Sequence, residues 1–337
     1  MIPKPNKMLF MLTLMSGTII SISSSSWFGA WMGLEINLLS FIPIIMSKTN
    51  QRTSEAALKY FIIQAVGSSV LIMASVGLMF KSALINTWLI QSPMILALLL
   101  KTGAAPVHFW FPGVMEGMAW MSGILLMTWQ KIAPLMLMSY MKIYELFMVS
   151  AALSGMVGAL GGLNQTLLRK LMAYSSIGHI GWMLSSMTIS ENFWMTYMLV
   201  YSLLSTILGV MFLSFNMFHL GQMFSMMAES FTKKFFFSSN LLSLGGLPPF
   251  LGFLPKWMVI QILMKTSVLI TITLIMSALL NLFYYLRISF ASFILLNQSS
   301  KWLTKSPNFN IKSPWETWLT MLSIGGMLFM PLIWPLM

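Results

Sequence analysis

Four ionisable side chains lie within long apolar stretches of the sequence: Glu35, Lys101, Lys131 and Lys256. A charge at the centre of a membrane costs at least about 2.5–3.5 kcal/mol, so such groups are retained where something offsets that cost. Burial disfavours the charged forms of amines and carboxylates alike, which makes proton uptake and release accessible. Three amines and one carboxylate in these surroundings predict proton transfer inside a membrane.

A lysine near the end of a membrane helix can instead extend its amine to the membrane surface. For Glu35 and Lys131 this alternative is weak, because each lies about ten residues, or ~15 Å, from either end of its predicted helix. Taken together, the four buried charges are better explained by a functional role than by chance placement near helix ends.

The composition of the whole chain is that of a membrane protein. Of its 337 residues, 58% are hydrophobic and 8% are charged, and the mean hydropathy is +0.83. A soluble protein carries about 25% charged residues. The net charge of +12 is attributed to loop topology, so no nucleic-acid partner is expected. The absence of cysteine excludes disulfides, thiolate zinc sites and cysteine-ligated iron–sulfur clusters.

Long apolar runs predict an all-α polytopic membrane protein with about 11 transmembrane helices. The runs lack the alternation of barrel strands and exceed their length of about 9–11 residues. The N-terminus has no Arg-rich presequence and no cleavage site, so the first apolar segment is expected in the mature protein. The predicted helices are 8–24, 27–46, 57–80, 90–106, 117–139, 144–163, 171–189, 193–217, 239–264, 266–293 and 316–336.

Lysine and arginine are concentrated in alternate loops between these helices. Three of the loop cations fall on the side opposite the N-terminus, namely Lys81, Lys142 and Lys265. By the positive-inside rule, the N-terminus faces the cytoplasm or matrix and the C-terminus faces the other side. Twelve cations fall on the N-terminal side: Lys4, Lys7, Lys48, Arg52, Lys59, Arg169, Lys170, Lys233, Lys234, Lys301, Lys305 and Lys312.

Two of the lysines lie beside residues that interrupt helices. A proline inside a helix removes a backbone hydrogen bond, and within lipid such a break survives only inside protein or beside a hydrated cavity. Breaks that serve only packing are the alternative. The residues concerned are Gly103 and Pro106 after Lys101, and Gly245, Gly246, Pro248, Pro249 and Pro255 before Lys256.

The two interrupted helices are the fourth and the ninth, so they are expected to run in opposite directions across the membrane. Paired broken helices of opposite direction are typical of an inverted repeat with an ion site near the midplane. We therefore predict a single transmembrane domain over 1–337, with repeat halves at roughly 27–163 and 171–293 and a C-terminal helix at 316–336.

Two histidines are weaker candidates for the same chemistry. His108 could relay protons between the membrane centre and the N-terminal side, or lie at the interface. His179 could be a relay or a hydrogen-bonded packing residue. A further pattern, glycine at every third position, predicts close helix packing rather than nucleotide binding; it comprises Gly155, Gly158 and Gly161. The sequence has no phosphate-binding loop, dinucleotide fingerprint or metal-ligand cluster, so no cofactor or metal is expected on this chain.

Three segments together resemble an antiporter-like family, the proton-pumping membrane subunits of respiratory NADH:quinone oxidoreductase (complex I). Residues 164–182, NQTLLRKLMAYSSIGHIGW, are similar to its central signature. Residues 101–112, KTGAAPVHFWFP, and 245–257, GGLPPFLGFLPKW, are similar to its two broken-helix motifs. Order and spacing match over essentially the whole chain, most closely the mitochondrial members from animals, insects in particular.

The resemblance implies roles that the residues alone do not give. Glu35 matches the family's essential glutamate, which pairs with the lysine matched by Lys101. Lys131 matches the central lysine, and Lys256 matches the lysine of the second broken helix. Together they imply a hydrated axis at mid-membrane that moves protons when quinone is reduced elsewhere in the complex.

The resemblance also implies a setting for the chain. It implies the mitochondrial inner membrane, with the N-terminus on the matrix side and the C-terminus on the intermembrane-space side. The implied partners are lipids and other membrane subunits of complex I, antiporter-like neighbours included, while FMN, iron–sulfur clusters and ubiquinone belong to other subunits. Relative to bacterial members, the chain is expected to lack the first three helices but to keep the four charges.

Three other interpretations compete with a pumping subunit. A freestanding cation/proton antiporter of the same fold is the nearest, and periodicity cannot separate the two. A carrier of b-type haems requires paired histidines at matching depths, and only His179 is well placed. A purely structural scaffold explains the helices but not four costly charges.

Overall fold

The computed structural model describes residues 5–46, 50–79, 87–141, 143–222 and 231–294, together with 320, 321, 323 and 325. Within these residues the regular structure is helical, apart from an isolated bridge between Leu167 and His219. The predicted all-α class is therefore confirmed. The predicted C-terminal helix 316–336 lies almost entirely outside the described residues. The chain forms two compact units, Met1–Ser154 and Gly155–Met337, which are described in turn.

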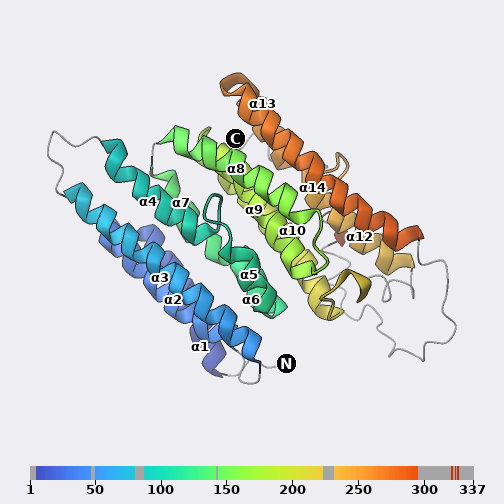
Figure 1. Ribbon diagram of the computed structural model, residues 1–337, viewed down its shortest axis with the longest axis horizontal. Coiled ribbons are helices and arrows are strands. Elements are labelled where there is room, and N and C mark those ends of the chain that lie inside the picture. The colour runs from blue at the N-terminus through green and yellow to red at the C-terminus, as the bar shows by residue number, and fades with distance from the viewer. Residues whose placement is uncertain are drawn as a thin grey trace. The chain divides into compact units, whose positions relative to one another are not determined.

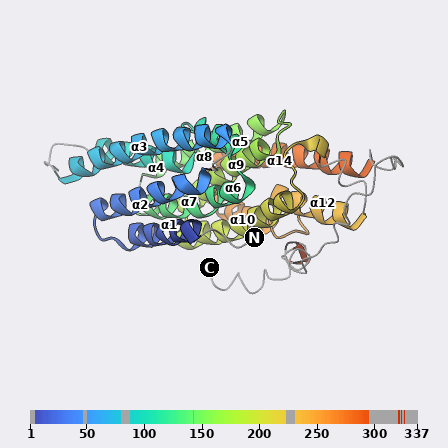
Figure 2. The ribbon, with the colours of Figure 1, turned by 90° about the horizontal axis from the view of Figure 1, so that it is seen from below.

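The first unit is built mainly from helices that pack side by side. Figures 1 and 2 both show α1 along α2 and α3 along α4. Helix α7 packs against α1, α2 and α4, while α3 also contacts α2 and α5. The helices are α1 (Pro5–Ser23), α2 (Trp27–Ile45), α3 (Gln51–Met79), α4 (Thr87–Thr102), α5 (Trp110–Gly117), α6 (Trp120–Met127), α7 (Trp129–Ser139) and the first part of α8 (Tyr144–Gly162).

The second unit begins within α8 and places α14 against α9, α12 and α13. Helix α10 packs against the same three partners, α9, α12 and α13. Each of the two longest helices of this unit therefore supports both segments of the broken pair α12 and α13. The helices are α9 (Leu168–Met187), α10 (Glu191–Ser214), α12 (Phe231–Gly245), α13 (Phe253–Thr266) and α14 (Val268–Ile294).

Helix boundaries differ from the predicted ones where a helix begins with polar residues. Helix α3 begins at Gln51, six residues before the apolar run, because Asn50 caps it: the Asn50 side-chain oxygen accepts from the backbone N–H of Arg52 at 3.3 Å. Hydropathy marks the part of a helix that crosses the membrane and misses such polar first turns.

The predicted helix 117–139 is divided at Thr128 into α6 and α7. The Thr128 hydroxyl donates to the Ile124 carbonyl at 2.8 Å, a local bond that bends helices. The predicted helix 239–264 is interrupted, as its glycines and prolines indicated, and its residues belong to the separate helices α12 and α13.

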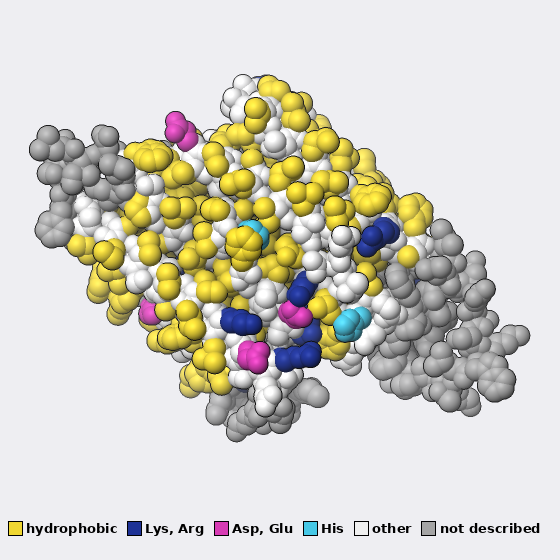
Figure 3. Space-filling view, viewed as in Figure 1, with side chains coloured by type: hydrophobic (Ala, Val, Ile, Leu, Met, Phe, Trp, Pro, Cys, Tyr) yellow, Lys and Arg dark blue, Asp and Glu magenta, His cyan; other side chains and the backbone are white. Residues whose placement is uncertain are grey.

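Among the described residues, six segments are long and apolar enough to cross a membrane, and the shorter helix Lys7–Ser23 is also apolar. This number is smaller than the eleven predicted, in part because α4, α5, α12 and α13 are each too short to be counted and in part because the predicted helix 316–336 lies almost entirely outside the described residues. The surface supports a lipid environment, since the face in Figure 3 is covered mainly by hydrophobic side chains. The six segments are Trp27–Ile45, Gln51–Leu78, Trp120–Ser139, Tyr144–Gly162, Glu191–Ser214 and Val268–Ala291.

The glycine pattern of α8 has the packing role predicted for it. A Cβ atom on Gly158 would lie 2.5 Å from the backbone nitrogen of Gly178 in α9. A Cβ on Gly161 would overlap the ring of Tyr174 in the same helix. Glycine thus lets the backbones of α8 and α9 approach more closely than any other residue would allow.

Helices α1 and α2 also meet through small residues. A Cβ atom on Gly33 would lie 2.5 Å from the backbone nitrogen of Ser21, and one on Gly17 would lie 2.9 Å from the backbone nitrogen of Asn37. Because α2 carries Glu35, this close approach fixes the position of a candidate functional residue.

We predict that Gly33→Ala destabilises the folded protein by about 1–3 kcal/mol, because the backbone of α1 must move away. The matched control is Gly113→Ala in α5, where the added Cβ meets nothing within 4 Å. That control should be neutral or stabilising by up to about 1 kcal/mol, since alanine favours helix. The measurement is the midpoint of heat denaturation of the chain in mildly solubilised membranes, and equal midpoints for the two variants would contradict the prediction.

Candidate functional site

The first break separates α4 from α5 by seven residues, 103–109. Gly103 adopts a φ of +77°, a left-handed conformation that favours glycine. The backbone N–H of Gly103 donates to Leu100 at 3.2 Å, and that of Ala104 donates to Leu99 at 3.0 Å. This pair of bonds is the Schellman motif, which ends a helix while satisfying its last carbonyl groups.

The second break separates α12 from α13 by the same number of residues, 246–252. Gly246 adopts a φ of +85°, and its N–H donates to Ser243 at 3.1 Å. The N–H of Leu247 donates to Leu242 at 3.3 Å, which completes a second Schellman motif. The ends of α4 and α12 therefore have the same backbone geometry.

The predicted break residues occupy different places within these segments. Pro106, Pro248 and Pro249 lie in the breaks themselves, whereas Gly245 is the last residue of α12. Pro255 is the third residue of α13, so it does not interrupt that helix. A proline is tolerated in the first turn because the N–H it lacks has no partner there.

The carbonyl groups exposed by the two breaks are capped differently. At the first break, the indole N–H of Trp110 donates to the Leu100 carbonyl at 3.0 Å, and the side-chain amide of Gln64 donates to the Lys101 carbonyl at 3.3 Å. At the second break, the ammonium of Lys256 donates to the carbonyls of Leu244 at 3.3 Å and Gly245 at 2.9 Å.

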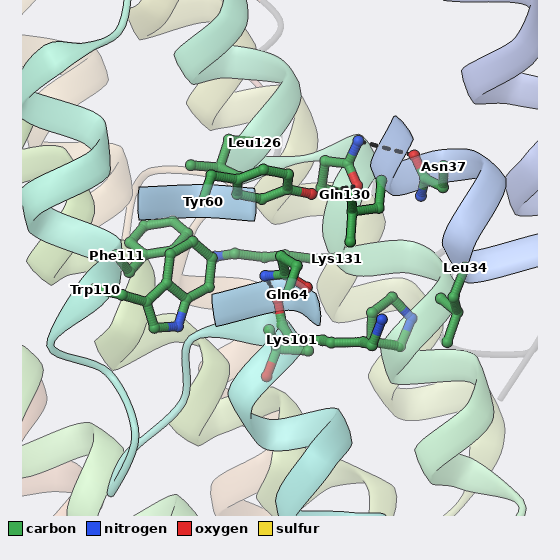
Figure 4. A pocket seen from close by; sticks show the side chains of 13 residues that line it. Leu34, Asn37, Tyr60, Gln64, Lys101, Trp110, Phe111, Leu126, Gln130 and Lys131 are labelled. Carbon is green, nitrogen blue, oxygen red and sulfur yellow. Dashed lines mark hydrogen bonds between the residues drawn. The ribbon is translucent and has the colours of Figure 1, made fainter. Parts of the chain in front are cut away.

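A small cavity lies beside the first break, between α2, α3, α4, α5, α6 and α7 (Figure 4). The cavity has room for one ordered water molecule, because the volume that the centre of a water can occupy is about 20 Å³. Lys101 and Lys131 enter the lining from α4 and α7, and the side chain of Lys131 extends toward Phe111. The cavity is lined by Leu34, Asn37, Leu38, Tyr60, Gln64, Lys101, Thr102, Trp110, Phe111, Leu126, Gln130, Lys131 and Pro134.

Both lysines of this cavity are almost completely buried, with 7% of Lys101 and 1% of Lys131 exposed. The ammonium of Lys131 lies 5.2 Å from the ring centroid of Phe111, within the range of a cation–π interaction. Phe111 can take this place because Gly103 has no side chain: a Cβ on Gly103 would lie 2.9 Å from the Phe111 ring. The first break thus positions the surroundings of Lys131 as well as Lys101.

Neutral polar side chains connect the helices around the cavity. The side-chain amide of Gln130 donates to the Asn37 side-chain oxygen at 2.9 Å (Figure 4), and Tyr60 donates to Gln130 over a longer 3.5 Å. Asn37 lies two residues after Glu35, and Gln130 directly precedes Lys131. The Asn37–Gln130 bond therefore links the helix of the carboxylate to the helix of the central lysine.

Glu35 lies near the middle of α2, as predicted, and is half-buried. It attracts the ammonium of Lys101 electrostatically. The carboxylate oxygen Oε2 is buried and accepts no hydrogen bond from the part of the chain that the structure describes. The described lining of the cavity includes neither Glu35 nor His108.

The remaining candidates occupy separate places. His108 is buried in the first break, where its Nδ1 donates to the Pro106 carbonyl at 3.3 Å. In the second unit, His179 is buried in α9, and its Nδ1 lies 2.9 Å from the hydroxyl of Tyr197. Its ring also contacts Tyr201, with centroids 5.0 Å apart. Both a relay and a packing role fit this environment of His179.

The neutral residues of the cavity were not among the sequence candidates. Asn37, Gln64 and Gln130 interrupt apolar helices just as the four charges do, so the cost of burying polar groups in a membrane could have pointed to them. Trp110 and Tyr60 carry no such signal, because aromatic residues are common throughout this chain. Among the described residues, no group of three His, Asp or Glu side chains could hold a metal ion.

Comparison with known proteins identifies the class. Residues 24–281 match the family described as NADH:quinone oxidoreductase/Mrp antiporter, TM. The fold is similar to a chain of respiratory complex I from Thermus thermophilus, with a TM-score of 0.83 and 22% identity over 98% of this chain and 78% of that one. It is also similar to a chain of the Mrp complex from Dietzia sp. DQ12-45-1b, with a TM-score of 0.73 and 15% identity over 83% and 59%. The chain belongs to the NADH:quinone oxidoreductase/Mrp antiporter family of membrane proteins.

Within that family, the similarity is to NADH-ubiquinone oxidoreductase chain 2. The identity is 51% to this protein from Anopheles gambiae, over 98% of both sequences. It is 48% to the protein from Locusta migratoria, over 88% of both. The predicted resemblance to complex I subunits of insects is confirmed.

We predict that Asn37→Leu and Gln130→Leu each destabilise the protein by about 1–3 kcal/mol, because each leaves a buried polar partner without its hydrogen bond. The double variant should cost less than the two single changes added together, since both partners are then removed. Heat dissociation of the native assembly measures all three. Costs that simply add would show that the Asn37–Gln130 bond is not formed.

Proposed function

We propose that this chain is a proton-translocating membrane subunit of respiratory complex I, which couples electron transfer from NADH to ubiquinone to proton pumping. The observation that carries the proposal is the buried cavity of the first unit, where two lysines from different helices face space for a water molecule. Membership in the family and 51% identity to a complex I subunit support the same conclusion.

The proposed proton carriers are Glu35, Lys101, Lys131 and Lys256. Glu35 attracts Lys101, and Lys101 shares its cavity with Lys131, so a proton leaving one of these groups alters the balance at the next. A water in the cavity would supply the short hydrogen-bonded connection that the lysines need. Lys256 would serve the second unit beside its own break. His108 and His179 remain candidate relays.

We further propose that the chain is one transmembrane domain of about 11 crossing helices, with an inverted repeat over roughly 27–163 and 171–293. Support comes from the two breaks, which have equal lengths and the same Schellman geometry. The broken pairs α4–α5 and α12–α13 would each count as one crossing, which accounts for part of the difference from six long apolar helices.

The proposed location is the mitochondrial inner membrane, with the N-terminus on the matrix side and the C-terminus on the intermembrane-space side. The proposed partners are lipids and other membrane subunits, neighbouring antiporter-like subunits among them. The chain itself would bind no FMN, iron–sulfur cluster or ubiquinone and would have no catalytic centre of its own, so its contribution to NADH:ubiquinone reduction is the movement of protons.

The first test concerns assembly. Membranes from the source are solubilised mildly, separated on a native gel and stained for NADH oxidation, and this chain is located by mass spectrometry. We expect it in a very large NADH-oxidising band. Migration alone or as a small oligomer would overturn the subunit proposal in favour of a freestanding antiporter.

The second test concerns Lys101. We predict that Lys101→Met lowers coupled NADH:ubiquinone turnover by at least about tenfold, because positioned proton-transfer groups contribute roughly 10²–10⁴-fold. NADH oxidation with an artificial electron acceptor should be unaffected, since no redox centre is altered. The matched control is Lys59→Met on the exposed surface of α3, which should keep full coupled turnover. Full proton pumping by the Lys101→Met variant would contradict the proposal and favour a purely structural role for this chain.

A further inference from the structure

Two buried polar atoms on α2 lack hydrogen-bond partners among the described residues: the indole Nε1 of Trp31 and the carboxylate Oε2 of Glu35. Buried polar groups are nearly always paired, so each exception requires a partner or a functional reason. The two atoms are complementary. An indole N–H can only donate a hydrogen bond, and an ionised carboxylate can only accept one.

Their spacing places these two groups on one face of α2. Residues four apart share one face of a helix, and the Cα–Cβ bonds tilt toward the N-terminus, so the Glu35 side chain leans back over the turn that carries Trp31. Trp31 is half-buried and packs against Phe28, with ring centroids 5.5 Å apart. This contact places the indole beside Phe28 on the same face of α2.

We propose that Trp31 is a positioning residue for Glu35. Its indole N–H donates to the Glu35 carboxyl group through one ordered water, and it keeps its own proton throughout. The bond occupies Oε2 and so orients the carboxyl group while the proton is exchanged with the rest of the path, on the side where Lys101 attracts it. The proposal rests on the role of Glu35 in the proposed function and adds Trp31 as the residue that orients the Glu35 carboxyl group.

Three Trp→Phe variants separate this role from general packing. Trp31→Phe keeps an aromatic ring against Phe28 and removes only the N–H. Trp27→Phe is the matched control, since it is the same change on the same helix but two turns, about 12 Å, from Glu35. Trp129→Phe tests the other indole of this unit whose buried Nε1 has no partner among the described residues.

The readout is the carboxyl C=O band of Glu35 in redox-induced infrared difference spectra of the assembled complex. The band is assigned by its loss in Glu35→Gln. We expect Trp31→Phe to move it to higher wavenumber, as occurs when a hydrogen bond to a carboxyl group is lost, and to lower coupled turnover roughly threefold to tenfold. Trp27→Phe should change neither quantity. A band that stays in place in Trp31→Phe, or that moves only in Trp129→Phe, overturns the proposal.

Trp31→His serves as a second variant, because imidazole retains a ring N–H on a smaller ring. It should hold the band nearer its wild-type position than Trp31→Phe and recover most of the coupled turnover. If Trp31→Phe fails to assemble, a coupled turnover in Trp31→His as low as that of Glu35→Gln contradicts the proposal on its own.

Glu35→Gln separates failure of this proposal from failure of the proposed function. Full coupled turnover in Glu35→Gln would remove Glu35 from the proton path, and the positioning role with it. Lost turnover in Glu35→Gln together with an unchanged band and turnover in Trp31→Phe would overturn the positioning role alone.

Discussion

In the interior of a membrane, every backbone carbonyl that a helix break releases must find a donor within the protein, because no bulk water is present. Both broken helices of this chain meet that constraint in two steps. A glycine in the left-handed conformation closes the last turn on itself, and side chains donate further hydrogen bonds to carbonyls of that turn. The side chains that cap each helix end determine which groups are left to face the site.

At the first break, the caps are Gln64 and Trp110, which are neutral and keep their protons. The amine of Lys101 is therefore available to the cavity. The absent side chain of Gly103 lets Phe111 close one wall of that cavity, where the ring faces Lys131. A single turn of backbone thus determines the surroundings of two lysines from different helices.

The charges could be predicted from the sequence because a membrane helix avoids charge, and the breaks because glycine and proline occur close together in both segments. Glu35 lies mid-helix as expected, and Gly103 and Gly246 end their helices. The division of 117–139 at Thr128 and the polar start of α3 were missed, since both depend on local side-chain hydrogen bonds that hydropathy does not register.

The partners of the site residues could not be predicted for a different reason. The bonds of Asn37 with Gln130 and of Gln64 with Lys101 join residues far apart in the chain, so they exist only once the helices pack. The same holds for Phe111 beside Lys131. A sequence marks which groups are costly to bury, whereas the fold decides which of them meet.

The capping of α12 by Lys256 makes the two lysines beside the breaks unequal. Hydrogen bonds from an ammonium are about twice as strong as those from a neutral donor. A proton that leaves Lys256 therefore weakens the anchorage of the last turn of α12, whereas the end of α4 is held by groups that never change charge. The side-chain hydrogen bonds that cap α12 therefore depend on the protonation of Lys256, whereas those that cap α4 do not depend on the protonation of Lys101.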